Sequence, residues 1–167
     1  MARSAPEDEA GQLPKDLERS VDAVLVFNLV RTHGYVSPYI DQTLKAGKLT
    51  GAQFNTLLAL GSAGDEGMLM GEIGERLVVS KSNVTGLIDR LEKHGLVERC
   101  ETPDRRATRV RLTSEGRAAL YEVLPAYRGA VCELTDCLSP AEKASLIELL
   151  TKLRRELRRK WREAKGS

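Results

Sequence analysis

The chain of 167 residues has few aromatic side chains and little cysteine. Aromatic residues make up 4% of it, so its core must consist mainly of leucine, valine, isoleucine and alanine. The three cysteines are odd in number and include no Cys-x-x-Cys pair. That pattern argues against a disulfide framework and against a structural zinc site. We therefore expect free thiols and no bound metal.

Long apolar runs are missing as well. No stretch approaches the roughly 18 consecutive apolar residues that a membrane span needs. The first 16 residues lack the apolar segment of a secretory signal, and residues 1–15 carry no periodic pattern, so we expect a frayed terminus there. These absences, together with the unpaired cysteines, predict a cytoplasmic protein with no membrane partner.

The residues that usually carry catalysis do not form a set. The two histidines, His33 and His94, stand on separate segments, with no cysteine or aspartate at the spacing of a nucleophile or a metal site. There is no glycine-rich phosphate loop. We therefore expect that the protein is not an enzyme and binds no cofactor.

Charge is balanced over the whole chain and unbalanced at one end. The formal net charge is +2, and charged residues make up 30% of a chain that is 41% hydrophobic, as in soluble globular proteins. Between Lys152 and Lys165, however, eight basic residues stand against two glutamates. Such a run is either a solvated helix face or a surface for nucleic acid, and the sequence leaves both interpretations open.

Apolar residues at helical spacing predict the first two helices. The first spans residues 16–47, with bends at Gly34 and Pro38. The second begins after Thr50, which is a favourable N-cap, and is stopped by Gly61 and Gly64. A short apolar extended piece, "GMLM", and a short helix follow.

The centre of the chain predicts a helix followed by a β-hairpin. The helix begins at Ser80 or Ser82 and is stopped by Gly95. The segments "LVERC" and "ATRVRLT" then alternate apolar and polar residues on either side of the turn "ETPDR". Period-two alternation around a Pro-Asp turn is typical of two antiparallel strands.

Two more helices complete the chain. Thr113 or Ser114 caps one that continues to about Leu138. Ser139, with Pro140 and Glu142 behind it, has the pattern of a capping box at the start of the last helix. The sequence therefore predicts a mainly α protein: a helix-turn-helix with a two-stranded β wing, flanked by long N- and C-terminal helices.

A helix-turn-helix places its second helix in the major groove of DNA, where the first residues of that helix meet base edges. Here that helix starts "SKSNVTGLIDR". Its candidate DNA-contacting residues are short hydrogen-bonding groups and one cation, namely Ser80, Lys81, Ser82, Asn83, Thr85 and Gly86. One cap needs a single serine, so the run of polar residues favours DNA contact over capping alone.

The hairpin turn carries Asp104, Arg105 and Arg106. A wing beside a recognition helix lies over the minor groove, whose negative potential attracts arginine. Asp104 would cap the turn and hold an arginine in place. On the returning strand, Arg109 and Arg111 share the exposed face and are expected to reach phosphates. The alternative is a charged turn that protects an exposed strand edge from aggregation.

From residue 49 to residue 120 the sequence resembles the MarR family of bacterial winged helix-turn-helix regulators. The similarity is carried by "LTGAQFNTLLAL", "VSKSNVTGLIDRLEKHGLVER" and "PDRRATRVRLTSEGRAAL". It implies a homodimer that binds double-stranded DNA at a pseudo-palindromic operator and is released, as a repressor, by a small phenolic or anionic ligand. It also implies an N-terminal dimerisation helix over 16–47, a DNA-binding lobe over 48–113, and linker and dimerisation helices over 114–167.

Two departures from the family's pattern affect the expected contacts. Gly86 stands where many members have a long polar residue, so Arg90 is expected to compensate. The approach to the turn, after Arg99, is about one residue shorter than in many relatives, so either Arg105 or Arg106 is the minor-groove arginine. Gly86 also motivates an alternative function, a winged-helix module for protein association with weak DNA binding.

Regulation has two candidate sites. One is a cluster on the first helix that is either an anion pocket for an effector or ordinary packing; its members are Phe27, Arg31, His33, Tyr35 and Tyr39. The other is Cys100, whose neighbouring cations favour a reactive thiolate and so a redox-sensing regulator. Cys132 and Cys137 are expected to be buried apolar residues.

Overall fold

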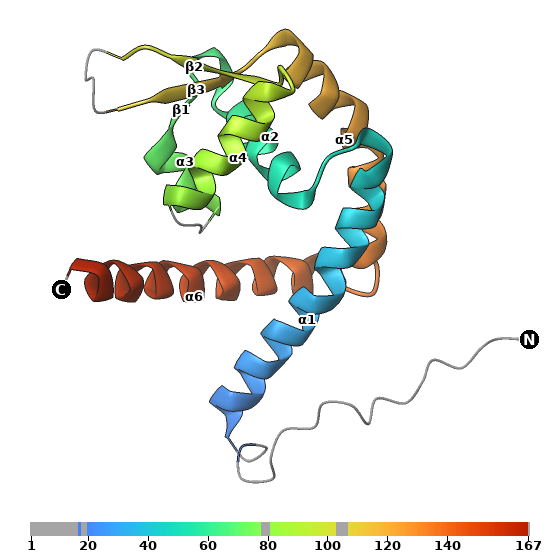
Figure 1. Cartoon of the computed structure of the whole chain (residues 1–167). Helices are drawn as coiled ribbons and strands as arrows, with labels where there is room; N and C mark the ends of the chain where they lie inside the picture. Colours follow the sequence, from blue (N-terminus) through green and yellow to red (C-terminus); the bar gives the residue numbers. More distant parts are fainter. Residues whose placement is uncertain (1–16, 18–19, 78–80, 103–106, 167) are drawn as a thin grey trace, which may run out of the picture.

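The computed structural model describes residue 17 and residues 20–77, 81–102 and 107–166 (Figure 1). The expected frayed segment, 1–15, lies outside the described residues, and so do Ser80 and the wing tip from Pro103 to Arg106. Helices dominate, and a small sheet lies at one edge of the folded lobe. Among the described residues, no helix is both long and apolar enough to cross a membrane.

The first helix, α1, spans Val21–Leu44. It begins later than the sequence predicts because Ser20 caps it, accepting a hydrogen bond from the Ala23 amide over 3.3 Å. Pro38 lies inside the helix. Proline has no N–H to donate to the carbonyl of Gly34, four residues earlier, and the helix continues past both residues, as expected. A 3₁₀ turn, η1, follows over Lys45–Gly47.

Helix α2 covers Gly51–Ser62 and begins with a capping box. The Gln53 amide donates to Thr50 Oγ1 over 3.3 Å, and the Thr50 amide donates to Gln53 Oε1 over 2.9 Å. These bonds satisfy amides that have no partner inside the helix. The 3₁₀ turn η2, Gly64–Glu66, then leads to β1, Met68–Leu69, and to α3, Met70–Leu77.

The sheet has three strands rather than two. Strands β2, Val97–Cys100, and β3, Arg109–Leu112, form the predicted antiparallel hairpin. The extended piece expected before α3 is β1, which pairs with the other edge of β3. Because β1 holds β3 from that side, the base of the wing is fixed to the lobe.

Two long helices close the chain. Helix α5, Ser114–Leu134, is capped by Thr113, whose Oγ1 accepts from the Gly116 amide over 2.9 Å. It ends four residues before the predicted Leu138. Helix α6, Pro140–Gly166, begins with the predicted capping box, in which the Ser139 amide donates to Glu142 Oε2 over 2.8 Å.

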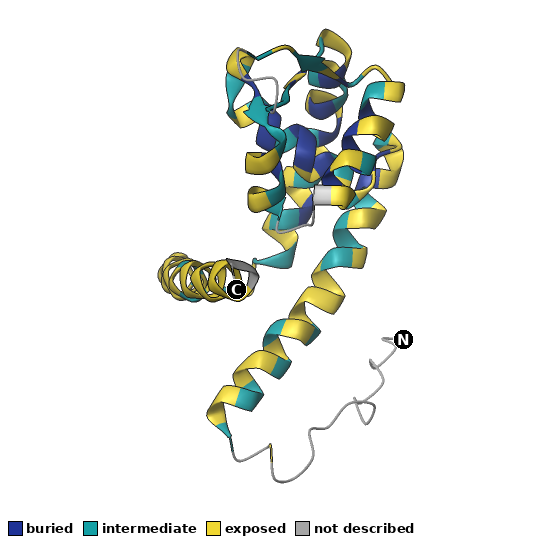
Figure 2. Ribbon diagram, turned by 60° about the vertical axis from the view of Figure 1, so that its left-hand side comes forward, coloured by how far each residue is buried: buried dark blue, intermediate teal, exposed yellow. Residues whose placement is uncertain are grey.

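The core lies in the lobe, where α2, α3, α4 and the sheet meet. Phe54, Leu60, Ile73, Ile88 and Val110 are all fully buried there. By contrast, the N-terminal part of α1 and nearly all of α6 are exposed (Figure 2). Long helices that project from a core in this way leave apolar side chains in solvent.

The expectation that Cys132 and Cys137 are buried is wrong for the single chain, because both are exposed. They lie at the end of α5 and in the turn before α6, beyond the part of α5 that covers the core. Their apolar character alone therefore does not bury them.

Candidate nucleic-acid interface

Helix α4, Lys81–Lys93, has one buried face and one exposed face. Val84, Leu87, Ile88 and Leu91 are 0–4% exposed and anchor the helix in the core. Helical periodicity then turns the intervening residues outward. The exposed set contains the candidate base-contacting residues Ser82, Asn83 and Thr85, with Asp89 and Arg90.

Gly86 and Arg90 lie one turn apart on α4. A Cβ built on Gly86 would meet Arg90 Nη1 at 3.8 Å and nothing closer. The Arg90 guanidinium therefore lies beside the space that a longer side chain at position 86 would use. This arrangement is compatible with the expectation that Arg90 supplies the DNA contact that Gly86 cannot make, since the Arg90 cation reaches the same surface.

The wing leaves the sheet as a narrow neck. Strand pairing sets Cys100 opposite Arg109. Beyond them the Thr102 hydroxyl donates to the Ala107 carbonyl over 2.6 Å. The neck is thus held together up to the two residues that flank the tip. The candidate residues Asp104, Arg105 and Arg106 lie outside the described residues, so the choice between the two arginines stays a prediction.

Arg99 joins the wing to α4. Its guanidinium donates to Asp89 Oδ1 over 2.6 Å and also to Glu92, whose Oε1 accepts from the Arg99 amide over 3.3 Å. The hydrogen bond to Asp89 raises the pKa of Arg99, with smaller contributions from the negative charges of Glu92 and Asp89, while burial acts in the opposite direction. The link fixes the strand that carries the wing against the exposed side of α4.

The arginines of β3 have partners within the lobe. Arg109 donates to the carbonyls of Glu66 and Gly67, over 3.1 and 3.3 Å. Arg111 pairs with Glu98 on β2 over 2.6 Å. They do lie on one face of the strand, since Val110 and Leu112 between them are buried. Both guanidiniums thus link β3 to its neighbours in the lobe, and their contact with phosphates stays a prediction.

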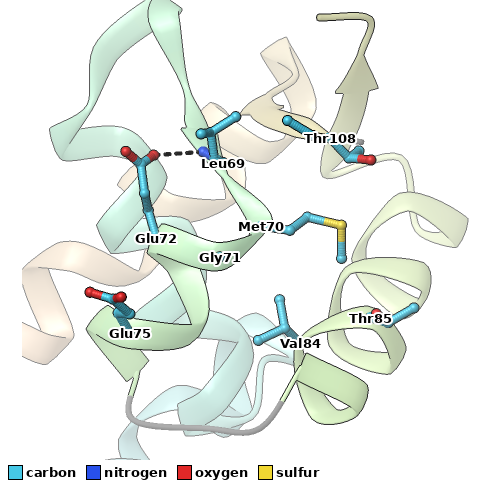
Figure 3. Close-up of a pocket in the computed structure, with 9 residues that line it drawn as sticks. Leu69, Met70, Gly71, Glu72, Glu75, Val84, Thr85 and Thr108 are labelled. Carbon is cyan, nitrogen blue, oxygen red and sulfur yellow. Dashed lines mark hydrogen bonds between the residues drawn. The ribbon is translucent and has the colours of Figure 1, made fainter. Parts of the chain in front are cut away.

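A hollow that the sequence does not predict lies beside α4. This hollow has a volume of about 530 Å³ and lies between α3, the first turn of α4 and the base of the wing (Figure 3). Met70 extends across it toward Thr85, and Glu72 accepts a hydrogen bond from the Leu69 amide over 2.7 Å. The hollow separates the first turn of α4 from the base of the wing, so the two present distinct surfaces.

The five residues of the expected effector cluster do not share one cavity. His33 lines a hollow of about 440 Å³ between α1, α2, α4 and α5, together with Ile40, Asn55, Leu87 and Tyr127. One residue of its wall, Leu87, belongs to α4.

The other four members of the cluster lie elsewhere. Arg31 stands over the Phe27 ring at 5.4 Å, and Tyr35 is 66% exposed. Tyr39 donates its hydroxyl to Glu133 Oε2 over 2.6 Å, and that hydrogen bond raises the pKa of Tyr39. Of the cluster, His33 is thus the member on the cavity wall.

Cys100, the candidate redox residue, is partly buried on β2. Within the described parts of the chain, no group of three or more histidine, cysteine, aspartate or glutamate side chains is arranged to hold a metal ion.

Comparison with known proteins identifies similar chains. A family model described as "MarR family" matches residues 48–107. The transcriptional repressor MprA of Escherichia coli (strain K12) is 34% identical over 114 residues, which are 68% of this chain and 65% of that relative. The chain thus spans slightly less than two thirds of the length of MprA.

Solved structures are similar over a larger share of their length. BpsR of Bordetella bronchiseptica, whose DNA binding is regulated by 6-hydroxynicotinic acid, is 30% identical with a TM-score of 0.70. The similarity covers 78% of this chain and 98% of BpsR. A cysteine-to-serine variant of MarR from E. coli, in complex with operator DNA, is 27% identical with a TM-score of 0.71, over 79% of this chain and 95% of that one.

Proposed function

The chain belongs to the MarR family of transcriptional regulators, and from this premise we propose that it is a homodimeric repressor that binds a pseudo-palindromic operator and is released by a small ligand. The observation that carries the proposal is the exposed polar start of α4 beside a wing that Arg99 fixes to the same helix. A helix and a wing held in one orientation are suited to reading a major groove and the adjacent minor groove.

Base contact is assigned to the N-terminal turns of α4. Asn83 has the amide that pairs bidentately with adenine, and Ser82 and Thr85 offer hydroxyl groups. Ser80 and Lys81, which precede these residues in the sequence, are assigned to phosphate contact, because a helix start attracts phosphate. Arg90 replaces the contact that Gly86 lacks. Arg105 or Arg106 enters the minor groove, supported by Asp104.

The homodimer is assigned to the helices outside the lobe. Large apolar side chains are exposed on α1 and α6, among them Val30 at 66%, Leu149 at 63% and Leu157 at 56%. Exposed apolar surface of this extent marks an interaction site. A second copy of the chain would bury it, with 16–47 and 114–167 as the dimer base and 48–113 as the DNA-binding lobe.

The effector site is assigned to the cavity at His33. It touches α1 of the base and Leu87 of α4, so a bound molecule would contact both parts. The imidazole and the Asn55 amide provide hydrogen bonds for a small aromatic ligand. The Asp41 carboxylate also lines the cavity and accepts a hydrogen bond from the Gly51 amide over 2.9 Å, so an anionic group of the ligand is assigned to the His33 side. The regulation of BpsR by 6-hydroxynicotinic acid supports this ligand class.

Selection of binding sites from randomised double-stranded DNA tests the proposal. The chain should enrich a two-fold symmetric sequence. Asn83→Ala should then lose roughly 1–3 kcal/mol of preference at one base position of each half-site. Ser145→Ala, which removes an exposed polar group from α6, is the matched control and should enrich the same sequence. Recovery of no preferred sequence would support the protein-association function instead.

A further inference from the structure

A basic cavity lies away from α4, where α6 passes the end of α3. It has a volume of about 480 Å³ and is lined by Arg76 of α3 and by four residues of α6, namely Thr151, Arg154, Arg155 and Arg158. In Figure 1, α6 runs below the lobe as a separate rod, so this cavity lies between the lobe and the helix. Four guanidinium groups and one hydroxyl group therefore border the same space.

The arrangement on α6 follows from sequence spacing. Residues 151, 154, 155 and 158 stand at i, i+3, i+4 and i+7, which places them on one face of a helix. That face lies beside the apolar stripe of Leu149, Leu153 and Leu157. Arg154 and Arg158 also border a neighbouring apolar hollow lined by Leu153 and Leu157, so the basic face adjoins the surface assigned to the homodimer.

Nearby carboxylates have other partners. Glu75 Oε2 accepts from Arg162 over 2.5 Å, and Arg159 pairs with Glu156 and Glu163. Within the described ranges, none of the recorded ion pairs involves the four arginines of the cavity. Like charges that share a hollow repel one another, and a bound anion would relieve that repulsion.

One contact connects this cavity to the lobe, and a second holds an arginine within α6. Arg158 donates to the Glu75 carbonyl over 3.2 Å, at the end of α3. Arg154 donates to Thr151 Oγ1 over 3.3 Å, which holds one guanidinium beside the cavity. An anion held by Arg76 and by the α6 arginines would bridge the lobe and α6.

We propose that this cavity binds a multiply charged phosphate anion, a diphosphate or triphosphate group. Guanidinium groups match phosphate oxygens in bidentate pairs. A single carboxylate would leave most of the fourfold positive charge uncompensated, whereas a diphosphate compensates nearly all of it. The group is either inorganic or part of a nucleotide. This site goes beyond the proposed operator binding and does not depend on it.

Calorimetric titration of the full chain with inorganic pyrophosphate tests the site. One saturable site per chain is expected. The double variant Arg154→Gln/Arg155→Gln, and separately Arg76→Gln, should weaken binding by about tenfold or more, because each removes charge-assisted hydrogen bonds. Arg159→Gln is the matched control on the same helix, since its guanidinium pairs with Glu156 and Glu163 outside the cavity, and it should leave binding unchanged.

A titration with ATP in place of pyrophosphate separates the two sources. Tighter binding of ATP assigns the site to a nucleotide, and equal binding assigns it to the phosphate group alone. Absence of saturable pyrophosphate binding, or an equal loss in Arg159→Gln, overturns the proposal. It is also overturned if the double variant weakens only DNA binding, because the arginines would then serve DNA phosphates. Pyrophosphate binding by a chain that binds no operator leaves this site standing.

Discussion

The Arg99 guanidinium on β2 donates a hydrogen bond over 2.6 Å to the Asp89 carboxylate on α4. The same side chain contacts Glu92 one turn further along the helix. A strand of the wing is thereby bound to the exposed side of the helix that is proposed to enter the major groove. The relative orientation of helix and wing depends on this contact, since the hollow in Figure 3 separates them at the opposite end of α4.

Loss of the Arg99 guanidinium should loosen the wing. We expect Arg99→Gln to weaken operator binding by roughly 1 kcal/mol, about fivefold in affinity, as for a partly exposed ion-pair network. Amide hydrogen exchange in β2 should also become faster. Arg117→Gln is the control, because it removes a 2.7 Å pair with Asp65 elsewhere in the lobe. Unchanged exchange and unchanged affinity in Arg99→Gln would show that the wing is held by other contacts.

A substitution at Gly86 tests whether the space beside Arg90 is open. Gly86→Ala should stabilise the chain by about 0.5–1 kcal/mol, because glycine inside a helix is costly and the new Cβ meets no atom closer than 3.8 Å. Gly95→Ala is the opposing comparison. Gly95 has a φ of 69°, which disfavours a side chain, so this variant should lose about 1 kcal/mol or more of its free energy of unfolding. Urea unfolding of both variants measures the difference. Destabilisation by Gly86→Ala would contradict the open space at that position.

The dimer base should be sensitive to charge on the apolar face of α6. Leu149→Asp places a carboxylate at a position where the leucine side chain is 63% exposed in the single chain. If a second copy buries this face, the variant should sediment as a monomer of 18.4 kDa while the wild type sediments at twice that mass. Ala144→Asp adds the same single charge at an exposed position five residues earlier, which helical geometry puts on the other side of α6, and should remain dimeric. A monomeric wild type would rule out the dimer base.

The effector site should depend on His33 and not on Tyr35. With 6-hydroxynicotinic acid as the probe, His33→Ala should need roughly tenfold more of it to release the operator, as expected for loss of a hydrogen bond to a charged group. Tyr35→Ala serves as the comparison, because Tyr35 is exposed on the same helix and does not line the cavity. An equal shift in both variants would place the ligand elsewhere.

Features that depend on neighbouring residues were predictable from the sequence. The caps at Thr50, Thr113 and Ser139 each involve atoms within one helical turn, so residue type and spacing were sufficient. The β2–β3 hairpin follows from alternation around a short turn. The buried face of α4 follows from helical periodicity.

Features that depend on distant residues were not predictable. Arg109 contacts the carbonyls of Glu66 and Gly67, more than 40 positions away, and nothing in its own segment indicates them. The same holds for the pairing of β1 with β3. The separation of the effector cluster is a third case, because helical spacing alone does not tell which side chains on α1 meet another element.

Binding of the enriched operator sequence as a function of salt tests the central claim most directly. The chain should prefer this sequence over a scrambled duplex by about 10³-fold or more. Its affinity should also fall steeply between about 50 and 200 mM salt, as phosphate contacts release counterions. Equal affinity for both duplexes, with a flat dependence on salt, would contradict the assignment of α4 and the wing as a DNA-reading surface.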